Sequence, residues 1–364
     1  MRIRKILQKI FKKSFHLIFK VFYGKINISR NLKTINFEKI EVKNLKIDKK
    51  NFNLNNNIYI IPEGRIFTDL NEHVAVIKDN LIIPEISFQQ IKNELKNVEH
   101  NRVIQKGTNR LQKKFDGRVF SLVQGGSGNN YFHFLFDIVT KLKIYEERFS
   151  LSDIDYFYVP GINSWQKQIL SLFKIDEKKL IDSNKYRHIK AREIIAIDHP
   201  WYKSGYIQKE IKKLPEWSIF FLREKFLDLR KKFQTSKKIF IDRTDSLYKH
   251  CKLINNQEVI EFLEKKGFKS YQTSKLDFYE QIYLFENAEI IISPHGAALT
   301  NIIFSKPGMR LFELIPKNHG SVKCERISSF LKFNYTRVDL DPLVTDNNEG
   351  DIKIELDQLE RILK

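Results

Sequence analysis

A histidine and a glycine follow a run of apolar residues in the last quarter of the chain. A buried strand is predicted at 289–293, and a helix is expected to begin just after His295 and Gly296. Where a strand of an open α/β sheet leads into a helix, the helix start offers free backbone N–H groups to a phosphate. The segment therefore predicts a phosphate-binding turn made of His295, Gly296, Ala297, Ala298, Thr300 and Asn301. The alternative is an ordinary strand-to-helix turn in which the small residues serve packing alone.

Two charged side chains follow other predicted strands of the same half. Arg243 comes directly after the strand-like segment Ile239–Asp242, and Glu313 lies at the end of a later strand. A guanidinium binds a diphosphate through a bidentate fork, and a carboxylate accepts hydrogen bonds from the hydroxyls of a ribose. Both residues are therefore predicted to contact a nucleotide. The alternative for Arg243 is a surface ion pair with Asp242 or Asp245.

A glycine-rich turn opens a predicted helix in the first half of the chain. Within Gly125–Asp137, His133 and Asp137 are four residues apart and so share one helical face. A carboxylate in this position fixes the tautomer of the imidazole and raises its basicity, as a general base for an acceptor hydroxyl requires. The turn is predicted to border the acceptor through Gly126, Ser127, Gly128, Asn130 and Tyr131. The alternative is a helix cap with a partly buried histidine bonded to the aspartate.

Other ligand motifs are weak or missing. The glycines of the turn do not follow the GxGxxG spacing, and the chain has no GxxxxGK(S/T) motif. DxD-like triplets occur at 153–155 and 339–341, but triplets this short arise by chance. No metal site is predicted and no cofactor is expected to be required, although these carboxylates leave a divalent metal open.

The elements that position these residues alternate between strand and helix. In the second half, strands are expected at 238–241, 270–273, 289–293 and 309–314, with helices at 257–266, 278–287 and 297–304. Such alternation is typical of a parallel, doubly wound sheet. The first half shows the same order from residue 118 onward, after a predicted helix at 87–98. The expected fold is α/β, with a basic segment 1–50, Rossmann-like domains at 51–215 and 216–345, and a C-terminal helix in 346–364.

The N-terminal segment has a different character from the rest. Residues 1–50 hold fifteen Lys and Arg against three Asp and Glu, an excess of twelve within a formal net charge of +20. Met1–Tyr23 reads as a basic amphipathic helix, which can lie on an anionic membrane surface or pack its apolar stripe on the protein. No apolar run is long enough to span a membrane, and the two cysteines form no CxxC pair. These features predict a cytoplasmic protein peripherally associated with the inner face of the membrane.

Together, the motifs resemble those of glycosyltransferase family 61, which includes bacterial capsular-polysaccharide enzymes. The resemblance runs from about Gly125 to Pro316 and is strongest in a series made of Phe278–Gln281, Asn287-Ala288, Pro294–Asn301, Phe304, Pro307-Gly308 and Glu313. The Asn130–His133 cluster, Asp137 and Arg243 fit the same pattern. Where a second arginine is expected after Arg243, this chain has Lys249 and Lys252 around Cys251.

The resemblance implies a GT-B fold, with two Rossmann-like domains facing across a cleft, a nucleotide-sugar donor and inversion at the anomeric carbon. The resemblance does not identify the sugar; we expect a UDP-sugar donor and an oligosaccharide or lipid-linked glycan acceptor in capsule or other surface polysaccharide synthesis. One alternative is a basic, non-catalytic nucleic-acid-binding protein, but the chain lacks the motifs of such proteins and nucleic acid is not expected as a partner. Another is a transferase of the same fold that moves a different group, such as pyruvate.

Overall fold

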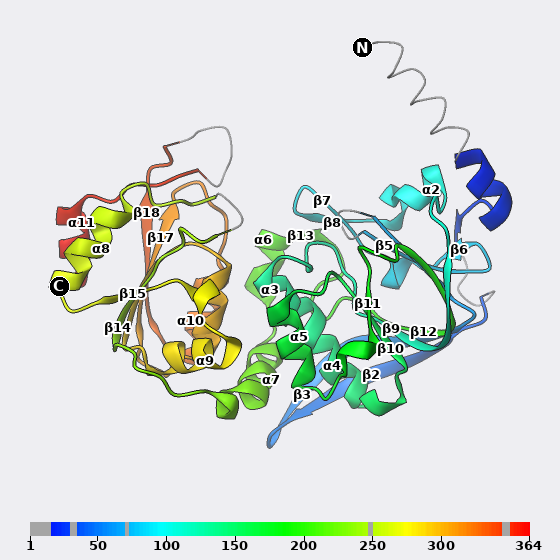
Figure 1. The fold of residues 1–364 in the computed structure, drawn as a ribbon, viewed down its shortest axis with the longest axis horizontal. Coiled ribbons are helices and arrows are strands. Elements are labelled where there is room, and N and C mark those ends of the chain that lie inside the picture. The colour runs from blue at the N-terminus through cyan, green and yellow to red at the C-terminus, as the bar shows by residue number, and fades with distance from the viewer. Residues whose placement is uncertain (1–15, 30–34, 70–72, 247–249, 344–349) are drawn as a thin grey trace, which may run out of the picture. The chain divides into compact units, whose positions relative to one another are not determined.

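The computed structural model describes residues 16–29, 35–69, 73–246, 250–343 and 350–364. The chain divides into two compact units, Met1–Ile207 and Gln208–Lys364 (Figure 1). The sequence placed a boundary eight residues later, after residue 215. The described part of the chain has no helix that is both long and apolar enough to cross a membrane.

The first unit is built on a mixed sheet. Its order is β1-β6-β5-β4-β12-β9-β10-β11, and β3 pairs with both β12 and β2. The strands are β1 Asn27–Ile28, β2 Glu38–Ile47, β3 Lys50–Pro62, β4 Arg65–Thr68, β5 Val74–Lys78, β6 Leu81–Ile82, β9 Lys113–Ser121, β10 Tyr156–Val159, β11 Leu180–Asp182 and β12 His188–Ile197. The neighbours β12, β9, β10 and β11 run parallel, whereas β3 and β4 run antiparallel to β12. All five residues of β5 are buried, as expected for a strand covered on both faces.

Several helices belong to the first unit. They are α2 Arg102–Lys106, α3 Tyr131–His133, α4 Thr140–Glu146 and α5 Ser164–Ser171, and residues 16–23 are also helical. Between α3 and α4 the chain forms a π-helix, η4, over Phe134–Val139, with all six residues buried. The ring of Tyr145 in α4 packs on Phe120 of β9 at 5.0 Å, so this helical run covers the sheet.

Three expectations for the first half need correction. The sheet is not the fully parallel sheet of a Rossmann-like domain, because β3, β4 and β5 are antiparallel to their neighbours. The predicted helix at 87–98 is a hairpin of β7 Gln89–Ile91 and β8 Glu94–Lys96, which pairs with β13 Gly205–Tyr206. Lys92 and Asn93 both have positive φ, as a two-residue type I′ turn requires. Finally, the segment 1–50 is not separate throughout, since β2 belongs to the sheet.

The second unit is a doubly wound domain, as predicted. Its sheet is parallel throughout in the order β15-β14-β16-β17-β18, with β14 Lys238–Ile241, β15 Lys269–Tyr271, β16 Ile290–Pro294, β17 Arg310–Pro316 and β18 Asn334–Leu340. The helices are α6 Ile207–Glu210, which starts at the boundary, α7 Glu216–Phe226, α8 Asn256–Lys265, α9 Phe278–Asn287, the 3₁₀ helix η10 Ala297–Phe304, α10 Lys323–Leu331 and α11 Leu356–Leu363.

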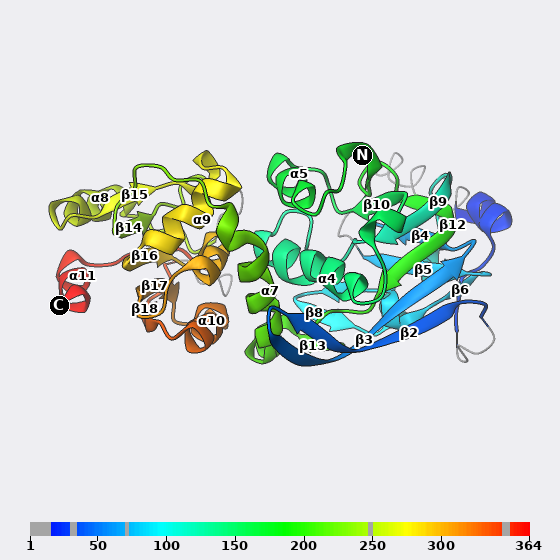
Figure 2. The same cartoon turned by 90° about the horizontal axis from the view of Figure 1, so that it is seen from below.

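Helices cover both faces of this sheet (Figures 1 and 2). On one face α8 and α11 bury Val259, Leu263 and Leu359 against Phe240 and Ile292 of the strands. On the other face lie α9, η10 and α10. Because both faces of the sheet are buried, its strands are continuous apolar runs such as Ile290-Ile-Ile. In sheets of this kind, ligands bind at the loops that follow the carboxyl ends of the strands.

Candidate functional site

The parallel sheet of the second unit has a topological switch point between β14 and β16. From β14 the chain crosses to β15 on one side, and from β16 it crosses to β17 on the other. In open α/β sheets, ligands bind at the carboxyl ends of the two strands that flank such a point. Those ends carry Arg243 and the His295-Gly296 pair, so the sheet brings together the predicted residues that lie 52 positions apart.

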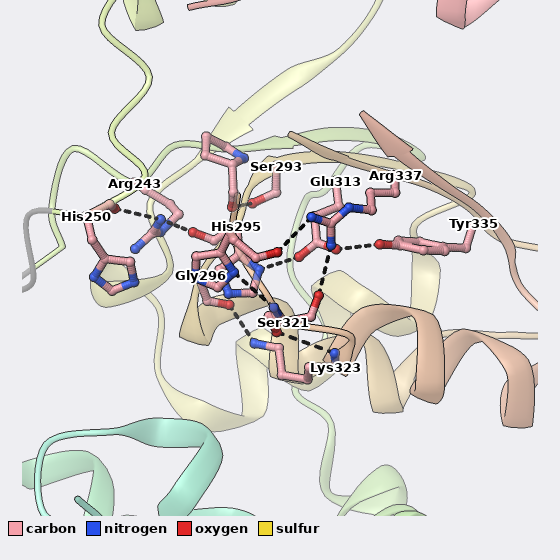
Figure 3. Close-up of polar contacts among 12 residues, drawn as sticks. Arg243, His250, Ser293, His295, Gly296, Glu313, Ser321, Lys323, Tyr335 and Arg337 are labelled. Carbon is pink, nitrogen blue, oxygen red and sulfur yellow. Dashed lines mark hydrogen bonds and ion pairs between the residues drawn. The ribbon is translucent and has the colours of Figure 1, made fainter. Parts of the chain in front are cut away.

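Arg243 lies against the backbone of the second strand's turn. Its Nη1 donates to the carbonyl oxygen of His295 (Figure 3). Its Nη2 donates to the hydroxyl of Ser246 at 3.3 Å. A Cβ on Gly296 would lie 2.7 Å from Nη2 of Arg243 and closer still to Cζ. A side chain at 296 would therefore displace the guanidinium, which occupies that space.

The alternative of a surface ion pair with Asp242 finds little support in these contacts. The Asp242 carboxylate is buried and accepts hydrogen bonds from Thr244, Asn256 and Gln272. Asp245 accepts one from the backbone of Ser274 at 3.2 Å. Asp242 thus shapes the loop after β14.

His295 is held by a buried carboxylate. Its Nδ1 lies 2.5 Å from Oε1 of Glu313, and Oε2 of Glu313 accepts from the hydroxyl of Tyr335 at 2.7 Å. Burial alone would raise the pKa of Glu313, but His295, Tyr335 and Lys323 lower it to about 2. Burial lowers the pKa of His295 to about 4, so at pH 7 a neutral imidazole donates to an ionised carboxylate. Both oxygens of Glu313 are engaged, which favours positioning of His295; the predicted ribose contact stays a prediction.

A second cation contacts the same turn from the helix that follows β17. Lys323, the first residue of α10, is 5% exposed, and its Nζ donates to the carbonyl oxygen of Gly296 at 2.8 Å. Arg337 of β18 secures the preceding loop by donating to the carbonyl oxygens of His319 and Ser321. Figure 3 shows Arg243 and Lys323 reaching successive carbonyls of one turn from different elements. This places two positive charges beside the start of η10, where an anion is favoured.

The remaining predicted donor-site residues lie at different depths. Ala297 and Ala298 are half-buried at the start of η10. Asn301 is fully buried, and its Nδ2 donates to Oε1 of Gln281 in α9 at 2.8 Å. Thr300 is equally buried, and its hydroxyl has no hydrogen-bond partner within the described residues. Asn301 therefore links η10 to α9 through a hydrogen bond. Ala297 and Ala298, in the first turn of η10, are the partly exposed residues.

In the first unit, His133 and Asp137 form the contact that their spacing predicts. His133 Nδ1 lies 2.8 Å from Asp137 Oδ2, and Asp137 Oδ1 accepts from Nε1 of Trp201 at 2.7 Å. Asp137 is 1% exposed, and the His133 side chain is 12% exposed. Burial alone would raise the pKa of Asp137, but His133, His199 and Trp201 lower it. The aspartate is thus an ionised group that holds His133 through Nδ1 and leaves Nε2 as the proton acceptor.

The sheet explains why Trp201 and His199 lie beside this pair. The parallel neighbours β9 and β12 end at one edge, so the glycine-rich turn after β9 and the Asp198–Trp201 segment after β12 meet there. His199 is 1% exposed, with Nε2 3.8 Å from Asp137 Oδ2, and burial lowers its pKa to about 3. Burial also lowers the pKa of Lys141, one turn after Asp137, to about 7.

Within the glycine-rich turn, most polar groups are satisfied by the protein. The Asn130 side chain caps α3 by accepting from the backbone of Phe132 and His133. Ser127 donates its hydroxyl to the carbonyl of Gln124, and the Gly128 carbonyl accepts from Gln166. The Tyr131 ring packs edge-on against Trp165. Gly126 lies next to the base candidate, because a Cβ there would be 3.9 Å from Cδ2 of His133. Acceptor contact by these residues stays a prediction.

The DxD-like triplets are engaged in other contacts. Asp155 accepts from the backbone of Arg118 at 2.7 Å, Asp339 pairs with Arg337, and Asp341 pairs with Lys317. Over the described ranges, no three His, Cys, Asp or Glu residues are grouped so that they could hold a metal ion. Independence from metal stays a prediction.

Several site residues were missed by sequence reasoning. Trp201 and His199 follow strand β12, so the rule that ligands bind at strand ends could have indicated them. Lys323 is the first residue of the helix that follows β17, so the same rule could have indicated it. Tyr335 and Arg337 lie inside β18, and no local pattern marks them.

The structure thus combines an α/β fold with a turn contacted by Arg243 and Lys323 in one unit and a histidine–aspartate pair in the other. The family model described as Glycosyltransferase 61 matches residues 131–312, from the first residue of α3 to the residue before Glu313. The chain belongs to glycosyltransferase family 61. It is therefore a glycosyltransferase, which takes a sugar donor and a glycan acceptor, and a non-catalytic nucleic-acid-binding role is not supported. No curated protein sequence matches the chain.

Proposed function

We propose that the chain is an inverting, GT-B-class glycosyltransferase that transfers a sugar from a nucleotide donor, a UDP-sugar, to a glycan acceptor in capsule or other surface polysaccharide synthesis. The proposal places the activity on the cytoplasmic side of the membrane. The observation that carries it is the pair of cations, Arg243 and Lys323, on the His295-Gly296 turn at the switch point of a parallel sheet.

The donor side of the reaction needs stabilisation of the leaving diphosphate. As the bond between the anomeric carbon and the diphosphate oxygen breaks, negative charge grows on that oxygen. Arg243 supplies a fixed charge beside the start of η10, and preorganised charge of this kind is usually the largest part of catalysis. Gly296 admits the guanidinium, and Lys323 adds a second charge. A divalent metal is then not required for charge neutralisation.

The acceptor side needs a group that takes a proton from the attacking hydroxyl. In the proposed reaction, the acceptor oxygen bonds to the anomeric carbon on the side opposite the diphosphate, and its proton passes to Nε2 of His133. The hydrogen bond from Nδ1 to Asp137 fixes the tautomer that leaves Nε2 as acceptor. The ionised Asp137 also stabilises the imidazolium that forms.

The test is a screen of UDP-, GDP- and CMP-sugars by thermal shift, followed by transfer assays with the donor that binds. A ligand at 100 times its dissociation constant adds about 2.7 kcal/mol to the free energy of unfolding. We expect UDP-sugars to stabilise the protein and a transferred sugar of inverted anomeric configuration in the product. Stabilisation by none of the nucleotides or by GDP- or CMP-sugars alone, or a product with the anomeric configuration retained, would contradict the proposal.

A further inference from the structure

The helix over residues 16–23 is fastened to the first unit along one side. The Tyr23 ring packs edge-on against His188 at 4.8 Å, and its hydroxyl accepts from the backbone of Gln112 at 3.1 Å. The Tyr23 carbonyl accepts from Nη1 of Arg65 at 3.3 Å, and His16 at the other end bonds to the carbonyl of Lys106 at 3.1 Å. The helix therefore has a defined inner face and a defined outer face.

The outer face is apolar and exposed. Leu17, Ile18, Val21 and Phe22 have exposed fractions of 64%, 49%, 85% and 76%. Positions i, i+1, i+4 and i+5 share one side of a helix. Leu111, 81% exposed, directly precedes Gln112, which binds Tyr23. These five side chains, the apolar anchor surface, are most of the large apolar side chains that lie exposed in the described ranges. Clustered exposed apolar groups mark an interaction site.

Cationic side chains lie close in the chain to the apolar anchor surface. Lys20 lies in the helix, Lys25 follows it, Lys106 ends α2 and Arg110 precedes Leu111, and all four are exposed. A pocket of about 440 Å³ between the helix and α2 is lined by three of these, Lys20, Lys25 and Lys106, and by no acidic residue. The fifteen residues that precede the helix contain six Lys and Arg and no Asp or Glu. An apolar face framed by cations matches an anionic lipid surface, whose acyl boundary takes the apolar groups and whose headgroups attract the cations.

We propose that the apolar anchor surface docks the protein on an anionic lipid bilayer, with Val21 and Phe22 inserted into the acyl boundary. Lipid binding of this kind requires neither donor nor acceptor, so it stands or falls separately from the proposed transfer reaction. It would hold the enzyme at the surface where a lipid-linked acceptor is presented.

The test is co-sedimentation of the full chain with phosphatidylcholine vesicles and with vesicles containing 30% phosphatidylglycerol. The variant Val21→Asp/Phe22→Asp changes two side chains that make little contact with the protein, so the fold should persist and unchanged circular dichroism checks this. Each lost insertion is worth roughly tenfold in partitioning, so at least a tenfold loss is expected. Ile254→Asp, a change at an exposed apolar residue of the second unit, is the control.

We expect the wild type and the control to bind the anionic vesicles, and binding to weaken at 0.5 M salt. Equal binding of the double variant would overturn the proposal, as would equal binding to both vesicle types. A wild-type dimer by light scattering that the double variant dissociates, without lipid binding by either protein, would assign the surface to a second copy instead.

Discussion

Replacing Gly296 by alanine tests the donor turn through a single added methyl group. The φ of Gly296 is 170°, an extended backbone that alanine also adopts, so the substitution strains no dihedral. The new Cβ would instead lie 2.7 Å from Nη2 of Arg243, and closer to Cζ. Because the neighbour is the end of a flexible side chain, Arg243 moves and the turn remains.

The magnitude follows from what Arg243 is proposed to do. A hydrogen bond to a charged group contributes about 1.5–3 kcal/mol, so a displaced guanidinium should weaken UDP binding by roughly 10- to 150-fold. Titration calorimetry measures the affinity, and a thermal melt checks the fold. Gly320→Ala is the matched control, since its Cβ would approach no atom closer than 3.8 Å and should leave affinity unchanged.

A double-mutant cycle makes the test specific. If Gly296→Ala acts through Arg243, it should add little to the loss caused by Arg243→Ala, because the displaced group is then already missing. Wild-type UDP affinity in a folded Gly296→Ala protein would refute the reasoning. So would a decrease in UDP affinity on adding Gly296→Ala to Arg243→Ala that is as large as the decrease in the wild-type background.

Much of the second unit could be predicted because its signals are local. Strand 238–241 and helix 278–287 have the predicted bounds, since an apolar run and an Asp277–Glu280 capping box mark them. The helix 297–304 also has its predicted bounds, but it is a 3₁₀ helix. A parallel strand buried on both faces is apolar throughout, so nothing beyond the run itself is needed to find it.

The first unit was harder because its pairings are distant. Strand β3 pairs Ile60 with Ile195 of β12, and no local pattern reveals such a partner. Strand β2 has one solvent-exposed face that carries Lys and Asn residues. Its sequence therefore looks polar, although Val42 and Leu45 are buried. Likewise the His133–Asp137 contact follows from helical spacing, whereas the bond from Trp201 spans 64 positions.

Further predictions concern the charges and hydrogen bonds of the two sites. Lys323→Met should lower UDP affinity and flatten its salt dependence, because a buried cation and its bond to Gly296 are lost; calorimetry at 0.05 and 0.5 M salt measures both, and unchanged affinity would contradict a role in binding. Trp201→Phe should lower kcat less than His133→Ala and leave UDP affinity unchanged, since only one bond to Asp137 is removed; an unaltered kcat would show that this bond is dispensable. Unfolded His199 takes up a proton below its usual pKa near 6.5, whereas the folded residue does so only near pH 3. The free energy of unfolding should therefore fall as the pH drops below 6.5, by up to about 1.4 kcal/mol per pH unit for this group. Urea titrations at pH 7 and 5 should show a smaller fall in His199→Gln, and an identical fall would exclude His199 as a source.

The central claim is that His133 removes the acceptor proton while the donor binds at the Arg243 turn. The most direct measurement is kcat together with donor affinity for His133→Ala, using the donor and acceptor identified by screening and the exposed His100→Ala as control. Loss of a general base should lower kcat by roughly 10²–10⁴-fold, with donor affinity unchanged and the control equal to wild type. Near-normal kcat in a folded His133→Ala protein, or a loss confined to donor binding, would contradict the account.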